Sequence, residues 1–176
     1  MKLLLHVCCA PCAVKCAEAL RKEADTALFW FNPNIHPFTE YENRLASVKL
    51  LAENENIPLI IHGTYGLRGF LTAVQENINE RCGVCYETRL YETAKFAAEN
   101  GFDCFSTTLL ISPYQNHELI KQTAEAAAKK FGVPFLYRDF RTLFRDGQKA
   151  AREAGFYMQK YCGCIFSEEE RYCQNK

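Results

Sequence analysis

Short apolar runs alternate with longer amphipathic stretches along the whole chain. Five apolar runs have the length of buried strands: residues 2–7, 26–31, 58–61, 102–107 and 134–137. Between them apolar residues recur at helical spacing, as Val14, Ala17 and Leu20 do in the first interval. Period and run length therefore predict five strands separated by helices.

The helices are predicted from apolar spacing and from end signals. They are expected at residues 13–23, from Thr39 onward, and at 67–75, 86–99, 117–131 and 147–154. Thr39 followed by Glu42 has the pattern of a capping box, and Gly132 is a typical helix stop. Alternating strands and helices favour an α/β fold, here a Rossmann-like three-layer sandwich. Its sheet of about five strands is expected to be mostly parallel, with helices on both faces.

Unusual segments follow four of the five predicted strands. These segments are Cys8-Cys9, residues 32–37, residues 108–117 and residues 139–145. Parallel α/β sheets bind ligands beyond the carboxyl ends of their strands, so the four segments predict one shared active site. We expect residues 1–176 to form a single domain, in which the cysteine-bearing extension 139–176 closes over this site.

Composition narrows the class of protein. The 176 residues are 48% hydrophobic and 24% charged, which is typical of a globular protein and excludes a disordered one. No apolar run approaches the roughly 18 residues of a membrane span, so we expect a soluble cytoplasmic protein. Nucleotide-binding signatures are absent: neither Gly-x-Gly-x-x-Gly nor a Walker-type Gly-Lys-Ser/Thr occurs.

Zero net charge, from 21 basic and 21 acidic residues, excludes a generally basic nucleic-acid binder but permits a local patch. Residues 138–160 contain such a patch, although a solvated helical face is the competing interpretation. Its basic residues are Arg138, Arg141, Arg145, Lys149, Arg152 and Lys160, against Asp139, Asp146 and Glu153.

Ten cysteines are the exceptional feature of the composition. Clustered cysteines in a cytosolic chain of this size indicate metal or redox chemistry more often than a disulfide scaffold. In Cys8-Cys9-Ala10-Pro11-Cys12, Pro11 suits the first turn of a helix, whose dipole favours thiolates. Cys82-x-x-Cys85 has the spacing of iron–sulfur, zinc and thioredoxin-type sites alike.

Cys8, Cys9, Cys82 and Cys85 together would supply four thiolates, enough for a cubane iron–sulfur cluster or a structural zinc. A location at the mouth of the sheet favours the cluster. Cys162-Gly163-Cys164 could close a small strained disulfide, which suggests a redox-active pair, or give one or both thiols to a metal. Cys16 and Cys104 are expected in the core and Cys173 on the surface.

Polar and aromatic side chains also gather in the predicted loops. They are Tyr41, Arg44, Tyr114, Gln115 and Asn116, which could stack on nucleobases and bond to base edges, or simply shape turns. His6 lies within the first strand and is expected to be a satisfied core histidine. His36 and His117 lie in polar loops, where either could donate a proton.

Several of these motifs, in order and over nearly the whole chain, closely resemble the cobalamin-independent epoxyqueuosine reductases. The matching stretches are His6-x-Cys8-Cys9-Ala10-Pro11-Cys12, residues 32–37, Glu40-Tyr41 with Arg44, Arg81-Cys82 with Cys85-Tyr86, residues 107–117, Asp139-Phe140-Arg141 and Gln159-Lys160-Tyr161-Cys162-Gly163-Cys164. The resemblance implies the last step of queuosine biosynthesis. In that step the epoxide of epoxyqueuosine, at the wobble position of a tRNA anticodon, is reduced to an alkene.

The resemblance also implies a four-iron four-sulfur cluster and an adjacent mononuclear iron ion. Cys8, Cys9, Cys82 and Cys85 match the cluster positions, and Cys162 with Cys164 match a redox-active pair. Cys12 and Cys162 are candidates for the second iron. An iron acting as a Lewis acid on the epoxide oxygen, with electrons from the cluster, would make the chemistry coherent.

Roles for the remaining residues follow as hypotheses. The leaving oxygen would receive its proton from one of three residues: Tyr114, His117 or Tyr41. The tRNA would be bound by Arg44, Asn116, Arg141, Arg145 and Lys160, with the modified base turned into the pocket. An electron-donor protein or a reductant would be the other partner, and no membrane would be involved.

Two other interpretations of the residues stay open. One is a cytosolic thiol–disulfide oxidoreductase that uses Cys162 and Cys164, with Cys82 and Cys85 as the resolving pair. The other is a zinc-braced tRNA-binding module without catalysis. Metal content distinguishes the three, because only the reductase needs iron and sulfide.

Overall fold

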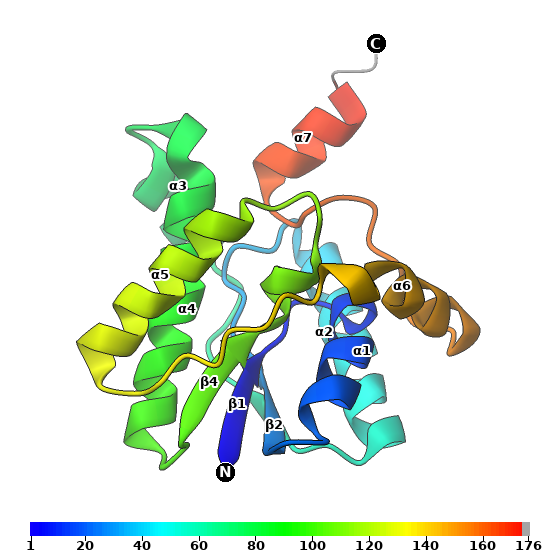
Figure 1. Cartoon of the computed structure of the whole chain (residues 1–176). Coiled ribbons are helices and arrows are strands. Elements are labelled where there is room, and N and C mark those ends of the chain that lie inside the picture. The colour runs from blue at the N-terminus through cyan, green and yellow to red at the C-terminus, as the bar shows by residue number, and fades with distance from the viewer. Residues whose placement is uncertain (174–176) are drawn as a thin grey trace.

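Four parallel strands form the centre of the molecule (Figure 1). The structure, a computed structural model, describes residues 1–173. The strands are β1 (Lys2–His6), β2 (Asp25–Trp30), β3 (Leu59–Ile61) and β4 (Cys104–Thr107), in the order β3-β2-β1-β4. Their parallel pairing and the helices between them confirm the predicted α/β sandwich.

The prediction of a fifth strand at residues 134–137 was wrong. Only Phe135 pairs with the sheet, through an isolated parallel bridge to Phe105. The backbone N–H of Phe105 donates to Pro134 at 3.0 Å, and that of Leu136 donates to Phe105 at 2.8 Å. Beyond this bridge the Leu136 carbonyl accepts a hydrogen bond from the Ser106 hydroxyl at 2.8 Å, so a side-chain contact stands where a longer ladder would have a backbone bond.

Helices cover both faces of the sheet, with α1 and α2 on one face and α4 and α5 on the other (Figure 1). The α-helices are α1 (Ala10–Leu20), α2 (Phe38–Glu55), α3 (Leu67–Val74), α4 (Arg81–Glu99), α5 (His117–Phe131), α6 (Phe144–Glu153) and α7 (Ile165–Cys173). Three 3-10 turns are η1 (Ile78–Glu80), η2 (Thr108–Ile111) and η3 (Arg141–Leu143). Helix α6 packs on α1, outside the three layers.

Some helix ends differ from the sequence prediction in ways that matter for the site. Helix α1 begins at Ala10 and α4 at Arg81, so their first turns carry the cysteine motifs. Pro37 occupies the N-cap position of helix α2 without a side-chain cap bond, so the expected Thr39 cap was wrong. Helix α7 was not predicted. It starts at Ile165, and the hydroxyl of Ser167 in its first turn accepts a hydrogen bond from the Gly163 N–H at 3.1 Å.

The core lies around β1 and β2. Leu3, Leu4 and Leu5 are all buried, as are Phe29 and Trp30. A central parallel strand is covered on both faces, which is why its sequence is continuously apolar rather than alternating. Cys16 and Cys104 are buried in this region, as predicted.

The carboxyl ends of β1, β2 and β4 lie at one edge of the sheet, and the C-terminal segment passes over that edge (Figure 1). Within residues 1–173, no helix combines the length and the apolar character that crossing a bilayer requires.

Candidate active site

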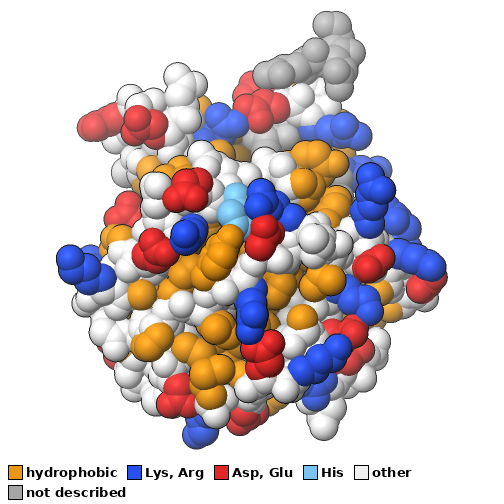
Figure 2. Space-filling model, viewed as in Figure 1, with side chains coloured by type: hydrophobic (Ala, Val, Ile, Leu, Met, Phe, Trp, Pro, Cys, Tyr) orange, Lys and Arg blue, Asp and Glu red, His pale blue; other side chains and the backbone are white. Residues whose placement is uncertain are grey.

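A cavity of about 710 Å³, here called the thiol cavity, opens at the carboxyl edge of the sheet. It is lined by Cys8, Cys9, Cys12, Arg44, Ser112, Tyr114, Gln115, Phe144, Gln148, Arg152, Gln159, Lys160, Tyr161, Cys162 and Arg171. These lining residues include four cations and no carboxylate. Lys and Arg side chains gather on the α6 side of the molecule (Figure 2). The segments predicted to meet at one site do so in part. Residues of the segments 8–9, 108–117 and 139–145 line this cavity, and none of the segment 32–37 does.

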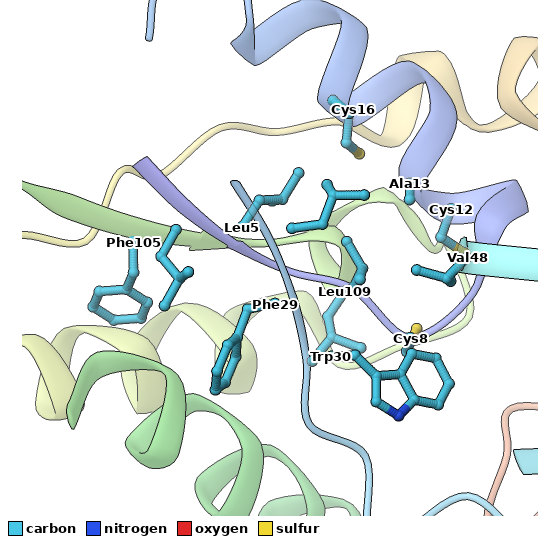
Figure 3. Close-up of a cluster of buried hydrophobic side chains, with 14 of the residues drawn as sticks. Leu5, Cys8, Cys12, Ala13, Cys16, Phe29, Trp30, Val48, Phe105 and Leu109 are labelled. Atoms are coloured by element: carbon cyan, nitrogen blue, oxygen red, sulfur yellow. The ribbon is translucent and has the colours of Figure 1, made fainter. Parts of the chain in front are cut away.

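The first wall of the thiol cavity is the N-terminal turn of α1. Cys8, Cys9 and Cys12 are buried there, and the Cys8 and Cys9 sulfurs are 4.0 Å apart. Figure 3 draws Cys8 and Cys12 together with Trp30 among the buried side chains of the core. Hydrogen bonds with the Cys12 and Cys9 thiols lower the pKa of Cys8 well below its usual range. The helix N-terminus supports the same thiolate.

The second cysteine pair lies in the first turn of α4. Cys85 is buried, and this burial raises the pKa of its thiol to about 12. The Arg89 guanidinium donates a hydrogen bond to the Cys85 sulfur at 2.9 Å. Cys82 is exposed and lines a separate cavity of about 900 Å³, the α4–α5 cavity. Burial also raises the pKa of Cys82.

Arg44 and the loop after β2 hold the C-terminal cysteine segment in place. The Arg44 guanidinium donates to the Tyr161 and Cys162 carbonyls, both at 2.9 Å. The His36 N–H donates to the Gly163 carbonyl at 2.7 Å, and the Tyr161 hydroxyl donates to the His36 carbonyl at 2.7 Å. Contacts between residues more than one hundred positions apart therefore fix this segment.

Cys162 and Cys164 are both free thiols in the structure. Cys162 lines the thiol cavity, and the protein around it raises its pKa to about 11 through desolvation. Cys164 is buried, with its sulfur 3.5 Å from the Ser167 hydroxyl. No disulfide joins them, and both their redox pairing and their ligation of a metal stay predictions.

The structure does not gather the cysteines around a single ion. Among residues 1–173, no three His, Cys, Asp or Glu side chains are arranged to hold one metal ion. The thiols are nevertheless close enough to interact electrostatically, since Cys8 acts on Cys162, and Cys162 acts on Cys85. A four-iron cluster is larger than one ion and holds its thiolates further apart, so this free-thiol set fits a cluster by its donor chemistry.

The three candidate proton donors lie in different surroundings. Tyr114 is 85% exposed and lines both cavities. Tyr41 is buried, and its hydroxyl accepts a hydrogen bond from the Trp30 indole at 3.1 Å. His117 is bonded to the Tyr137 hydroxyl at 3.0 Å and lines neither cavity. Of the three, Tyr114 alone is placed to reach a ligand in the thiol cavity.

The candidate tRNA-binding residues do not all lie at one cavity. Lys160 lines the thiol cavity, as does Arg44, although Arg44 is buried and paired with Glu40 at 2.7 Å. Asn116 caps α5 by accepting from the Leu119 N–H at 3.0 Å, and lines the α4–α5 cavity.

Arg141 and Arg145 lie outside the lining of both cavities. Arg141 forms an ion pair with Asp139 at 2.6 Å. Arg145 is exposed on α6.

Three residues at the site were not assigned a role from the sequence. Arg171 on α7 and Gln159 line the thiol cavity, and the Gln159 amide donates to the Cys9 sulfur at 3.0 Å. The amide oxygen of Gln159 is buried without a hydrogen-bond partner among the described residues, as is that of Gln115. Arg89 could have been found from its spacing, because Cys85 and Arg89 lie one helical turn apart.

The chain is similar to known proteins over nearly its whole length, not only at the site. A profile of the family described as Epoxyqueuosine reductase QueH matches residues 3–170. The protein of that name from Dehalococcoides mccartyi is 38% identical over 172 residues, 97% of this chain and 94% of that protein. The one from Thermotoga maritima is 36% identical over 179 residues, 96% of this chain and 91% of that protein. The chain belongs to the epoxyqueuosine reductase QueH family.

Proposed function

We propose that this protein reduces the epoxide of epoxyqueuosine in tRNA to the alkene of queuosine. The reaction takes up two electrons and two protons, and the epoxide oxygen leaves as water. We infer the reaction from the family to which the chain belongs. The thiol cavity is the structural observation that supports it. Its wall combines four cysteine thiols with cations and aromatic rings, and contains no carboxylate to repel a nucleic acid.

The proposal assigns a four-iron four-sulfur cluster to Cys8, Cys9, Cys82 and Cys85, and a separate iron to Cys12 and Cys162. All six thiols are free, which is the state that ligation requires once their protons are lost. Such a cluster supplies the electrons that no set of side chains can provide.

The residues of the cavity wall bind and orient the substrate. Lys160 and Arg152 are exposed cations at the wall, suited to phosphates next to the modified nucleotide. Tyr114 and Tyr161 offer rings for stacking, and the unpartnered amide oxygens of Gln115 and Gln159 can accept from base or sugar donors. The Tyr114 hydroxyl is our candidate for delivering a proton to the leaving oxygen.

The C-terminal extension closes one side of this cavity in our proposal. Helix α6 and residues 159–162 supply much of its wall, and Arg44 ties them to α2. The predicted extension runs to residue 176, and its last three residues lie outside the described ones. We further propose that the protein acts in the cytoplasm, with an electron-donor protein or a small reductant as its second partner.

The test is conversion of epoxyqueuosine to queuosine in tRNA by protein purified without oxygen and supplied with a chemical reductant. Cys82→Ala and Cys173→Ala form a matched pair, because both thiols are exposed and only Cys82 is an assigned ligand. We expect Cys82→Ala to abolish conversion and to lower bound iron and sulfide. Cys173→Ala should leave conversion, bound iron and bound sulfide unchanged, as measured by nucleoside mass spectrometry and by iron and sulfide analysis.

Two outcomes contradict the proposal. Wild-type protein that holds iron and sulfide yet leaves epoxyqueuosine unreacted would refute the reaction. Iron-free protein that catalyses thiol–disulfide exchange would instead favour the dithiol alternative.

A further inference from the structure

Arg89 is a buried cation with no carboxylate partner among residues 1–173. It lies on α4 with 3% of its surface exposed. Arg44 is equally buried, but its guanidinium is paired with Glu40 at 2.7 Å. Transferring an isolated charge from water into a protein interior is strongly unfavourable, so a buried guanidinium normally has an anion beside it. Arg89 therefore requires a source of negative charge.

The surroundings of Arg89 identify that source. Its guanidinium donates to the Cys85 sulfur at 2.9 Å and, through Nε, to the Cys85 carbonyl at 3.1 Å. The other groups on which its charge acts include the thiols of Cys8, Cys82 and Cys162. The Tyr86 phenol also faces Arg89, but a phenol is a weaker acid than a thiol. Among residues 1–173, the anions that form most readily around Arg89 are thus cysteine thiolates.

We propose that Arg89 is the internal counter-cation of the metal–thiolate centre, and that it retains the metal and favours its reduced state. This inference rests on the proposed function, which assigns Cys8, Cys82 and Cys85 to a cluster. Four thiolates give such a centre a net negative charge, and each added electron increases it. A fixed positive charge and a hydrogen bond to one ligand sulfur stabilise both the assembled and the reduced centre.

The proposal predicts opposite effects of one substitution on the metal-free and metal-loaded protein. Arg89→Met replaces the cation with an apolar side chain. In metal-free protein it should raise the midpoint of thermal unfolding by a few degrees, because the uncompensated charge is gone. Arg44→Met is the matched control, and it should lower the same midpoint because it leaves Glu40 buried without its partner.

In metal-loaded protein the sign reverses. We expect Arg89→Met to release iron to a chelator at least tenfold faster than wild type. We also expect its reduced-to-oxidised ratio at a fixed potential to fall at least tenfold, equivalent to about 59 mV for one electron. Arg89→Lys keeps the charge and should recover most of the iron retention. Chelator kinetics and a redox titration followed by absorbance provide these readouts without an activity assay.

The possible failures are distinguishable. If Arg89→Met lowers the metal-free midpoint as Arg44→Met does and leaves iron retention at the wild-type rate, Arg89 is a structural residue and this inference is overturned alone. If wild-type protein prepared without oxygen contains no iron and sulfide, the proposed function fails and the counter-cation role fails with it.

Discussion

Two features of the structure require glycine at position 163: its backbone conformation and the close approach of the Arg44 side chain. Its φ of +147° lies in a region that side chains rarely allow, and a Cβ built on it would lie 3.2 Å from a guanidinium nitrogen of Arg44. The same guanidinium donates to the Cys162 carbonyl. A glycine between Cys162 and Cys164 therefore allows Arg44 to approach the chain closely enough to hold it.

Gly163→Ala should consequently loosen the cysteine segment. We expect a loss of about 2–3 kcal/mol in the free energy of unfolding, from backbone strain and from displacement of Arg44. Denaturant unfolding measures it, and faster alkylation of Cys164 would report local opening.

Gly101→Ala separates the two causes. Gly101 also has a positive φ, +72°, but no atom lies within 4 Å of its Cβ position. It should lose only about 1 kcal/mol, the cost of the backbone conformation. Equal losses at both positions would show that the Arg44 contact is unimportant.

His36 connects the loop after β2 to the start of α7. Its Nδ1 accepts a hydrogen bond from the Ile165 N–H at 3.3 Å, and its Nε2 lies 3.2 Å from the Pro33 carbonyl. These partners require the neutral ring protonated at Nε2. Burial lowers the pKa of His36 from 6.5 to about 4.

This lowered pKa predicts a pH dependence of stability. Between pH 6.5 and 4 the unfolded chain takes up a proton at His36 that the folded chain refuses, so stability falls as the pH falls. The loss should approach about 3 kcal/mol and level off below pH 4. The slope of the unfolding free energy against pH, measured from pH 7 to 4, reports the protons taken up on unfolding. The slope for His36→Gln should correspond to one proton fewer than that for wild type. An unchanged slope would contradict the assignment.

At the scale of elements, the contact of α6 with α1 shapes one wall of the thiol cavity. Gly147 lies on the contact face of α6, where a Cβ would be 2.9 Å from the Pro11 carbonyl oxygen. Phe144, Gln148 and Arg152 on α6 line the cavity. The missing side chain at Gly147 thus sets how closely these residues approach the cysteines of α1.

Gly147→Ala should push α6 away from α1. The expected loss is about 1–3 kcal/mol in the free energy of unfolding, even after the gain that alanine normally brings to a helix. Gly69→Ala is the matched helical control, since no atom lies within 4 Å of its Cβ position, and it should stabilise the protein slightly. Thermal unfolding compares the two, and a stabilising Gly147→Ala would be inconsistent with close packing there.

At the scale of the whole molecule, charge is balanced overall but not locally. The net charge is zero, whereas the residues lining the thiol cavity include Arg44, Arg152, Lys160 and Arg171 and no acid. Binding of a polyanion should therefore be local and salt-dependent. The long basic stretch recognised in the sequence contributes Arg152 and Lys160 to this lining, while Arg138 and Arg141 form ion pairs with Glu23 and Asp139.

Lys160→Glu should weaken tRNA binding about tenfold or more. It should also reduce the slope of the logarithm of the binding constant against the logarithm of the salt concentration by about one, the value for one phosphate contact. Lys95→Glu, on the exposed face of α4 outside both cavities, is the control and should change binding little. Titrations at several salt concentrations measure both effects. Equal weakening by the two variants would indicate only the change in net charge.

The sequence was a good guide to the elements and to the cysteine motifs. Local signals are strong there, because apolar period, Pro11 and Gly132 act within a few residues. It was a poor guide at residues 134–137, where the apolar run was expected to form a fifth strand and makes only an isolated bridge. There Leu136 is bonded to the hydroxyl of Ser106, thirty positions away, a contact that no local pattern indicates.

The alternation of strands and helices, the cysteines at the start of α1 and the resemblance to one family could all be read from the sequence. Folding decides which groups meet: Gln159 with Cys9, Arg44 with the Cys162 carbonyl, and Arg89 with thiols and, within residues 1–173, no carboxylate. The physical reason is range. Period and capping are fixed by neighbours along the chain, whereas burial of a charge and the lining of a cavity depend on residues that only folding brings together.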